Sequence, residues 1–147
     1  MRYRLFSILI TAALCLLSGG CEELDGGLVF DEIYVYEDGN LIDAQNLVIE
    51  LPASGGVIEK EFVTYGIRGL RSVKLAEGLS AELLSSYPPT EDELYEAGEY
   101  LSRYKQTIRF KAEPNNGRKS RGAKIMVNTD GYNGYAAYVY IQQPSAK

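Results

Sequence analysis

The last third of the chain carries the pattern that most constrains its fold: three segments in which apolar and polar residues alternate strictly. The apolar positions are Ile108, Phe110 and Ala112, then Ala123, Ile125 and Val127, and finally Tyr135, Ala137, Val139 and Ile141. A period of two puts alternate side chains on opposite faces of a β-strand. The turn-rich stretches EPNNGRKSRG and NTDGYNG separate the segments. We therefore predict three closing strands, each with one face directed at a core.

The preceding residues add further strand signals. Residues 30–36 are rich in β-forming types, and EDGN at 37–40 is typical of a tight turn before a return strand. The stretch 46–66 predicts two strands broken at Pro52 and Gly55, and the mixed charges of the second indicate an edge strand or a bulge. Shorter strand signals surround 73–75 and 81–84. About seven or eight strands predict an all-β, antiparallel β-sandwich.

One insert, residues 88–105, has a different character. Thr90 and Glu93 fit a capping box, and acidic residues crowd the positions between and after them. Apolar residues then recur at helical spacing at Leu94, Ala97, Leu101 and Tyr104. The insert therefore predicts a short helix, with an ordered loop as the alternative.

The N-terminus has the three-part layout of a bacterial secretory signal. Arg2 and Arg4 precede an apolar run from Leu5 to Leu17, and small residues follow. The run is too short to span a bilayer, which takes about 20 apolar residues. We expect residues 1–20 to be a removed signal peptide.

Cys21 follows the small residues directly, and this arrangement resembles a lipobox. The resemblance implies that Cys21 is lipidated, becomes the first mature residue and anchors the protein in a membrane. Cys15 lies within the leader, so Cys21 is the single mature thiol and has no internal disulfide partner. The alternative is an ordinary signal peptide followed by an incidental cysteine.

Three acids, Glu22, Glu23 and Asp25, follow within the flexible tether of residues 21–28. An acidic cluster behind a lipidated cysteine resembles the export signal of surface lipoproteins in gut Bacteroidota. The resemblance implies an outer-membrane protein exposed on the cell surface. A plain solvated tether is the alternative.

The composition excludes several functional classes. The chain has no histidine, which removes histidine-based catalysis and the usual zinc sites. Without the two leader arginines, 13 basic residues face 20 acidic ones, a net charge of −7 (15 − 2 = 13; 13 − 20 = −7). This balance argues against nucleic acid as a partner. We expect no catalytic residues, no metal site and no cofactor, and hence a protein that is not an enzyme.

Two stretches, LVIELPASGGVIEKEFVTYG and IRFKAEPNNGRKSRGAKIMVNTDGYNGYAAYVYIQQ, together resemble a BACON domain (Bacteroidetes-associated carbohydrate-binding, often N-terminal) over residues 46–144. The resemblance lies in the order of short motifs: the turn at 54–56, Asn115 or Asn116, Arg121, and a last strand running into 142–143. It implies an immunoglobulin-like sandwich, here a single domain over 29–147. It also implies binding to carbohydrate or a mucin-like glycoprotein, or a spacer role.

Tyrosines are the candidate ligand-binding residues, since their rings stack on sugar faces and their hydroxyls form hydrogen bonds. The candidates are Tyr132, Tyr135, Tyr138 and Tyr140 near the last strand, with Tyr95 and Tyr100 in the insert. The alternative is that tyrosine serves as a strand former on a half-buried surface. A basic run at 118–124 is either a contact for sulfated or sialylated glycans or a solvated hairpin end.

The sequence thus favours a non-enzymatic surface lipoprotein that binds carbohydrate or a glycoprotein. The rival hypothesis is a structural accessory subunit or spacer that packs on a protein partner in an envelope complex.

Overall fold

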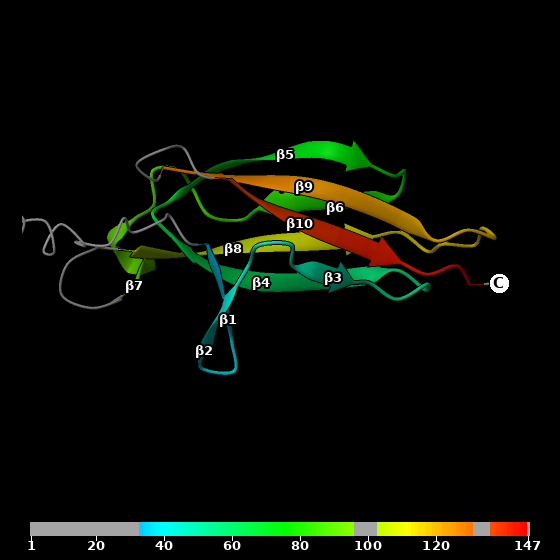
Figure 1. Cartoon of the computed structure of the whole chain (residues 1–147), viewed down its shortest axis with the longest axis horizontal. Coiled ribbons are helices and arrows are strands. Elements are labelled where there is room, and N and C mark those ends of the chain that lie inside the picture. The colour runs from blue at the N-terminus through cyan, green and yellow to red at the C-terminus, as the bar shows by residue number, and fades with distance from the viewer. Residues whose placement is uncertain (1–32, 96–102, 131–135, 147) are drawn as a thin grey trace, which may run out of the picture. The chain divides into compact units, whose positions relative to one another are not determined.

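The computed structural model describes residues 33–95, 103–130 and 136–146, which belong to one compact unit, Asp31–Lys147 (Figure 1). The predicted leader and tether, with Cys21 and the acids at 22, 23 and 25, lie outside the described residues. Within the described residues, no helix is long and apolar enough to cross a membrane.

The described strands form two sheets. The larger sheet has the order β2-β1-β4-β8-β6, and β7 adds to β8. Its strands are β1 (Tyr34–Glu37), β2 (Asn40–Asp43), β4 (Gly56–Thr64), β6 (Leu79–Leu83), β7 (Leu94–Tyr95) and β8 (Arg103–Ala112). The smaller sheet has the order β3-β10-β9-β5. Its strands are β3 (Val48–Glu50), β5 (Ile67–Leu75), β9 (Arg121–Thr129) and β10 (Ala136–Gln143).

The strand order is that of an immunoglobulin-like sandwich. The strands β1-β4-β8-β6 correspond to the ABED sheet of that fold, and β5-β9-β10 correspond to its CFG sheet. All pairs are antiparallel except β3, which runs parallel to β10. The predicted all-β sandwich is confirmed. The described residues hold ten strands, four of them with four residues or fewer.

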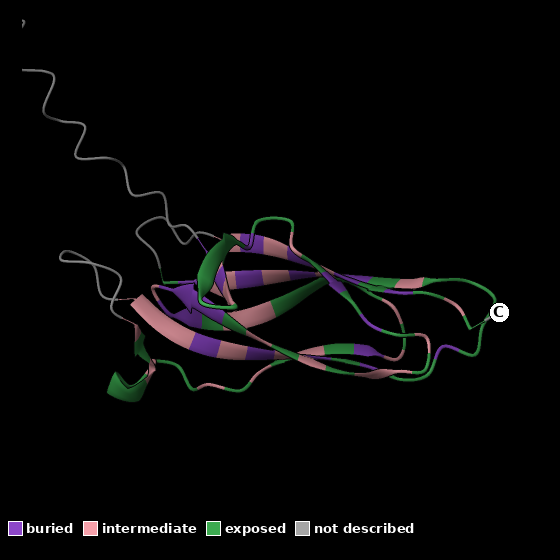
Figure 2. Cartoon of the chain, turned by 90° about the horizontal axis from the view of Figure 1, so that it is seen from below, coloured by how far each residue is buried: buried purple, intermediate pink, exposed green. Residues whose placement is uncertain are grey.

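The core lies between the sheets and is built from the alternating residues. On β8, β9 and β10 the apolar residues at every second position are buried, while those between them are half-buried or exposed (Figure 2). Phe62 of β4 and Phe110 of β8 are both fully buried, with ring centroids 6.4 Å apart. The predicted alternation is confirmed wherever the residues are described; Tyr135 lies outside them.

Two turns need glycine. Asp38 and Gly39 both have positive φ, 50° and 83°, as a type I′ hairpin requires, so EDGN joins β1 to β2 as predicted. At Gly55, with φ of 81°, an added Cβ would lie 2.8 Å from the carbonyl oxygen of Ala112. The predicted break between strands at Gly55 is therefore also a place where the backbone closely approaches that of Ala112.

The described residues of the insert, 88–95 and 103–105, do not form the predicted α-helix. The capping chemistry is present, because the Glu93 carboxylate accepts a hydrogen bond from the Thr90 backbone N–H at 2.7 Å. It produces only a 3₁₀ turn over Glu91–Glu93. Leu94 is already extended and pairs with Tyr104, since ladder bonds to β8 are formed in place of further helical turns. Ala97, Tyr100 and Leu101 lie outside the described residues.

The charged strand 56–64 is not simply an edge. β4 lies between β1 and β8, but β1 pairs only with its residues 61–63. The first half of β4 is therefore open on one side, and Val57 there is 54% exposed. Glutamates at 59 and 61 flank Lys60 along this half, which suits the protection of an open edge.

A polar cluster joins the β4–β5 turn region to the loops at one end of the sandwich. Arg68 and the Tyr87 hydroxyl both donate to the Asp130 carboxylate, and the Arg68 guanidinium lies 5.8 Å from the Tyr87 ring centroid. The Tyr87 hydroxyl, helped by Arg68, holds the pKa of Asp130 below its ordinary value of 3.8. Hydrogen bonds with Tyr87 and Asp130, together with the negative charge of Asp130, raise the pKa of Arg68.

Replacing Phe110 with alanine should remove a fully buried side chain from the core. We expect Phe110→Ala to lower the free energy of unfolding by about 3–5 kcal/mol, because a fully buried aromatic side chain leaves a cavity. Urea denaturation measures this loss. Val57→Ala, at an exposed position, is the control and should change stability by no more than about 0.5 kcal/mol. Equal losses in the two variants would contradict the assigned core.

Asp130 should make stability depend on pH in the acid range. Its folded-state pKa is depressed, so its contribution is complete above about 4 and is lost as the pH falls through the folded value. We expect wild type to be more stable than Asp130→Asn at pH near 6, and the difference to shrink towards pH 2. Denaturation at a series of pH values measures this, with Asp38→Asn as the control outside the cluster. A difference that stays constant across the range would be contrary evidence.

Candidate functional site

The outer face of the smaller sheet carries two tyrosines in line. Ala137, Val139 and Ile141 of β10 are buried, so Tyr138 and Tyr140 point to the opposite side, where both are half-buried. In the register, Tyr138 lies opposite Met126 of β9 and Tyr140 opposite Lys124. Residues two apart on a strand are separated by about 7 Å. The two rings therefore form a short aromatic strip on a sheet surface.

Lys124 lies over this strip. Its Nζ is 3.9 Å from the ring centroid of Tyr138 and 5.6 Å from that of Tyr140. A cation over an aromatic face is attracted by the ring quadrupole, at about 0.5–1 kcal/mol for a partly exposed pair. The flexible lysine side chain thus covers part of the aromatic surface that a ligand would contact.

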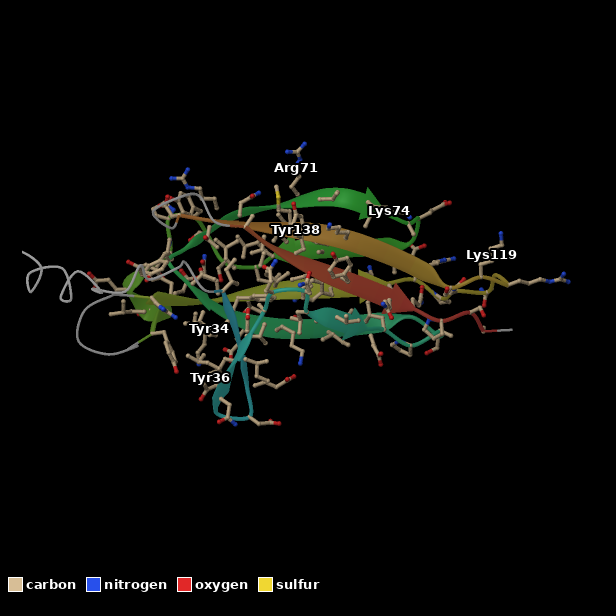
Figure 3. All side chains as sticks on the ribbon, in the orientation of Figure 1. Tyr34, Tyr36, Arg71, Lys74, Lys119 and Tyr138 are labelled. Atoms are coloured by element: carbon tan, nitrogen blue, oxygen red, sulfur yellow. The ribbon has the colours of Figure 1, made fainter. Side chains whose placement is uncertain are left out.

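A bulge in β5 adds two more cations to this face. The register of β5 against β9 shifts between Ser72 and Lys74, and Val73 is the extra residue. The shift brings Lys74 directly opposite Lys124, while Arg71 lies opposite Met126. Without it, simple alternation would turn Lys74 to the same side as the buried Ile125. We name the set Arg71, Lys74, Lys124, Tyr138 and Tyr140 the tyrosine face; Figure 3 labels Arg71, Lys74 and Tyr138.

The charges of the tyrosine face are not balanced. Among the described residues, Arg71, Lys74 and Lys124 form no ion pair. Lys74 and Lys124 are moreover a cross-strand pair of like charge, an arrangement that destabilises a sheet.

The outer face of the larger sheet is different in this respect. Its Arg109 pairs with Glu59 at 2.8 Å and lies 3.9 Å from Glu82, and Lys105 lies 3.8 Å from Glu61. Acidic residues thus neutralise the central cations of that face, whereas the corresponding cations of the tyrosine face have no acidic partner within the described chain.

A hollow of about 850 Å³ adjoins the tyrosine face at the end of β10. Gln142, the next outward residue after Tyr140, lines it together with Glu50 of β3, its register partner. Gly122 of β9 lies on the other side of Gln142 and has no side chain to fill the space. A Cβ there would make only an ordinary contact, 3.5 Å from the Ile141 carbonyl oxygen. The polar and charged residues that line the hollow beside the rings are Glu50, Ser120, Arg121, Gln142 and Gln143.

Two buried amides hold the loops around the hollow. The Nε2 of Gln143 donates to the carbonyl oxygens of Pro52 and Glu113, at 3.0 and 2.8 Å. The Nδ2 of Asn115 donates to those of Lys119 and Pro144, at 2.9 and 3.0 Å. The Gln143 Oε1 is buried and has no hydrogen-bond partner in the described structure. Gln143 is also one of the residues that line the hollow.

A second tyrosine cluster lies on the outer face of the larger sheet. The Lys105 Nζ is 3.9 Å from the Tyr36 ring centroid and 5.5 Å from that of Tyr95, and these two rings meet edge to face at 6.0 Å. The Arg103 Cζ lies 5.1 Å from the ring centroid of Tyr34 and 5.4 Å from that of Tyr65.

This second cluster acts as a small additional core. Val63 lies on the outward side of β4, opposite Tyr34 and Lys105, yet it is fully buried. The sequence analysis missed Tyr34, Tyr36 and Tyr65. The alternation of Tyr34 and Tyr36 about the buried Val35 was the signal that could have identified the first two.

Only part of the predicted tyrosine set is brought together. Tyr138 and Tyr140 share one face, but Tyr95 lies on the other sheet, so the six candidates do not form one surface. Tyr100, Tyr132 and Tyr135 lie outside the described residues.

The basic run at 118–124 is also divided. Lys124 belongs to the tyrosine face, whereas Arg121 pairs with the buried Gln143 and points to the other side. Arg118 and Lys119 are exposed in the connection between β8 and β9; Figure 3 labels Lys119. Within the described ranges, no group of three or more cysteine, aspartate or glutamate residues is placed to hold a metal ion.

Comparison with known proteins gives little further information. No family model matches the chain, and no curated protein matches it. Among solved structures, it is similar to a Bacteroides ovatus GH5 xyloglucanase in complex with a XXXG heptasaccharide, at 16% identity and a TM-score of 0.40. The match covers 78% of this chain and 19% of that one, so the chain spans about a fifth of its length.

Proposed function

We propose that this chain is a non-enzymatic, lipid-anchored protein of the outer membrane, exposed on the cell surface, whose β-sandwich binds a glycan or a mucin-like glycoprotein. The observation that carries the proposal is the tyrosine face, which leads directly into the hollow beside Gln142.

The chemistry of this surface suits a sugar chain. Two tyrosine rings in line offer flat apolar surfaces for the C–H faces of successive pyranose rings. The amide of Gln142 and the carboxylate of Glu50 can exchange hydrogen bonds with sugar hydroxyls in the adjoining hollow. A small number of polar groups beside an aromatic surface is the usual composition of a small-ligand site. The resemblance to BACON domains in the sequence supports the same class of ligand.

The lipid anchor is supported by the sequence alone. The leader ends in small residues before Cys21, and acids follow at 22, 23 and 25. Diacylglycerol with an N-acyl chain gives firmer membrane binding than a single acyl chain, at about 0.8 kcal/mol for each buried CH₂. An anchor of this kind would hold the sandwich at the surface, where extracellular glycans are accessible.

An accessory role in an envelope complex is the second candidate, and one observation favours it. β2 is an edge strand of the larger sheet, and its Leu41 and Ile42 are 37% and 44% exposed. An open strand edge with apolar side chains is suited to pairing with a strand of another protein. On this alternative, recovery of one stoichiometric envelope protein would depend on β2 and not on the tyrosine face.

Removing either ring should weaken glycan binding. We expect Tyr138→Ala and Tyr140→Ala each to weaken binding about tenfold or more, since each loses one stacking surface. Screening the purified full chain on an array of neutral and acidic glycans, then calorimetry with the best ligand, measures this. Tyr138→Phe is the matched control and should bind nearly as wild type, because the ring remains.

The hollow provides a separate check on the same surface. Gly122→Val should fill it without backbone strain and should weaken binding, while thermal unfolding stays close to wild type. The proposal would be abandoned if no glycan on the array binds wild type. It would also be abandoned if binding survives all three changes, Tyr138→Ala, Tyr140→Ala and Gly122→Val.

The anchor can be tested by metabolic labelling. We expect radiolabelled palmitate to enter the wild-type protein in a bacterial host and not Cys21→Ser, which should remain as the unprocessed precursor. Cys15→Ser is the control and should be labelled normally, because that residue lies within the leader. Equal labelling of Cys21→Ser and wild type would be inconsistent with a lipid on Cys21.

A further inference from the structure

The unbalanced charge of the tyrosine face indicates the class of its ligand. The chain has a formal net charge of −5, yet one sheet face gathers Arg71, Lys74 and Lys124 with no acidic partner among the described residues. Like charges at Lys74 and Lys124 cost stability, and a bulge in β5 is what brings them together. An arrangement that destabilises the free protein and leaves cations accessible is suited to an anionic ligand.

We propose that the tyrosine face binds an acidic polysaccharide, one that carries sulfate or carboxylate groups along its sugar chain. Lys74, Lys124 and Arg71 contact the anionic groups, and the two tyrosine rings contact the sugar faces. This inference rests on the proposed function, because it assumes that the face binds sugar; it adds the charge of that sugar.

The layout of the face matches such a chain. The rings lie on β10, Lys124 lies on the neighbouring β9, and Arg71 and Lys74 lie on β5 beyond it. Neighbouring strands are about 4.8 Å apart, so Lys124 lies about one strand spacing from the aromatic strip and Arg71 and Lys74 lie about two. The hollow at the end of the strip is lined by both Glu50 and Arg121, whereas Lys74 and Lys124 of the tyrosine face lie opposite each other with no acid between them.

Lys124 couples charge to stacking. Its ammonium lies 3.9 Å from the Tyr138 ring centroid, so a sugar that stacks on this ring must displace it. A neutral sugar offers the displaced ammonium no comparable partner. A sulfate or carboxylate on the sugar offers an ion pair instead, so the same movement uncovers the ring and engages the charge. Acidic sugars are therefore favoured over neutral ones of the same backbone.

The observations favour a polysaccharide over other polyanions. Nucleic-acid-binding surfaces are strongly basic and belong to basic domains, whereas this chain has a sequence pI near 4.8 and three cations on one face. The aromatic strip beside those cations has two rings on a flat sheet, an arrangement that suits successive sugar rings. A DNA duplex is therefore an outcome of the test and not part of the proposal.

The experiment uses the purified full chain with two matched pairs of polymers: dextran sulfate with dextran, and polygalacturonate with its methyl ester. Calorimetry at low salt should show at least one charged polymer binding about tenfold or more tightly than its neutral partner, with affinity falling as salt is added. Failure of both charged polymers to bind would overturn this inference. So would equal binding of a neutral partner, although that result leaves the proposed function intact.

Variants assign the effect to the face. Lys74→Gln and Lys124→Gln should each weaken binding of the charged polymer about three- to tenfold. Lys111→Gln, an equal loss of charge on the outer face of the larger sheet, is the control and should bind as wild type. The inference would be overturned if all three changes weakened binding equally. It would also be overturned if a short DNA duplex bound equally tightly at the same salt concentration, because either result would indicate a general attraction of polyanions.

The melting temperature of Lys74→Gln distinguishes a ligand-binding role of Lys74 from a structural one. Because Lys74 faces Lys124, Lys74→Gln should leave the melting temperature unchanged or raise it while binding weakens. A fall in both melting temperature and affinity would indicate that Lys74 supports the sheet, and this result would also count against the inference.

Discussion

The whole arrangement depends on burial of one side chain in every two between the sheets. Phe62 and Phe110 meet at the centre of that layer, and the apolar residues of β8, β9 and β10 close it on both sides. A strand that commits alternate residues to the core presents the others outward at fixed spacing, about 7 Å apart. The buried residues thus fix the spacing of the outward side chains. Tyr138 and Tyr140 are in line because Ala137, Val139 and Ile141 are buried.

The two outward surfaces use similar residues in different ways. On the larger sheet, tyrosines and cations close over Val63, and acids on neighbouring strands pair with Arg109 and Lys105. Acidic partners thus pair with the two central cations of that surface, and its ring cluster behaves as a second core. On the smaller sheet, tyrosines and Lys124 lie beside Arg71 and Lys74 with no acid opposite them among the described residues. The difference in charge balance, more than the number of rings, distinguishes a packed surface from one suited to a ligand.

The sequence predicted features that depend on a single strand, such as which of its residues are buried. It did not predict conformations that depend on pairing with another strand. Alternation identified the buried residues of β8, β9 and β10 and the outward side of Tyr138 and Tyr140, because the period of two is a property of each strand. The capping box at Thr90 was also correct, but pairing of Leu94 with Tyr104 decided the conformation that follows it. The capping signal at Thr90 carries no information about which strand the residues after it will pair with.

The cations of the tyrosine face could not be found from the sequence for the same reason. Lys74 and Lys124 are fifty positions apart (124 − 74 = 50), and they meet only because the extra residue Val73 shifts the register of β5. Read along the chain, Lys124 belonged with Arg118 and Arg121, yet alternation sends Arg121 to the opposite side of β9. A bulge is a local loss of ladder pairing that changes which side chains share a face. In this sheet, that loss creates a row of charge beside two aromatic rings, and the covering lysine links the charge of a ligand to its access to those rings.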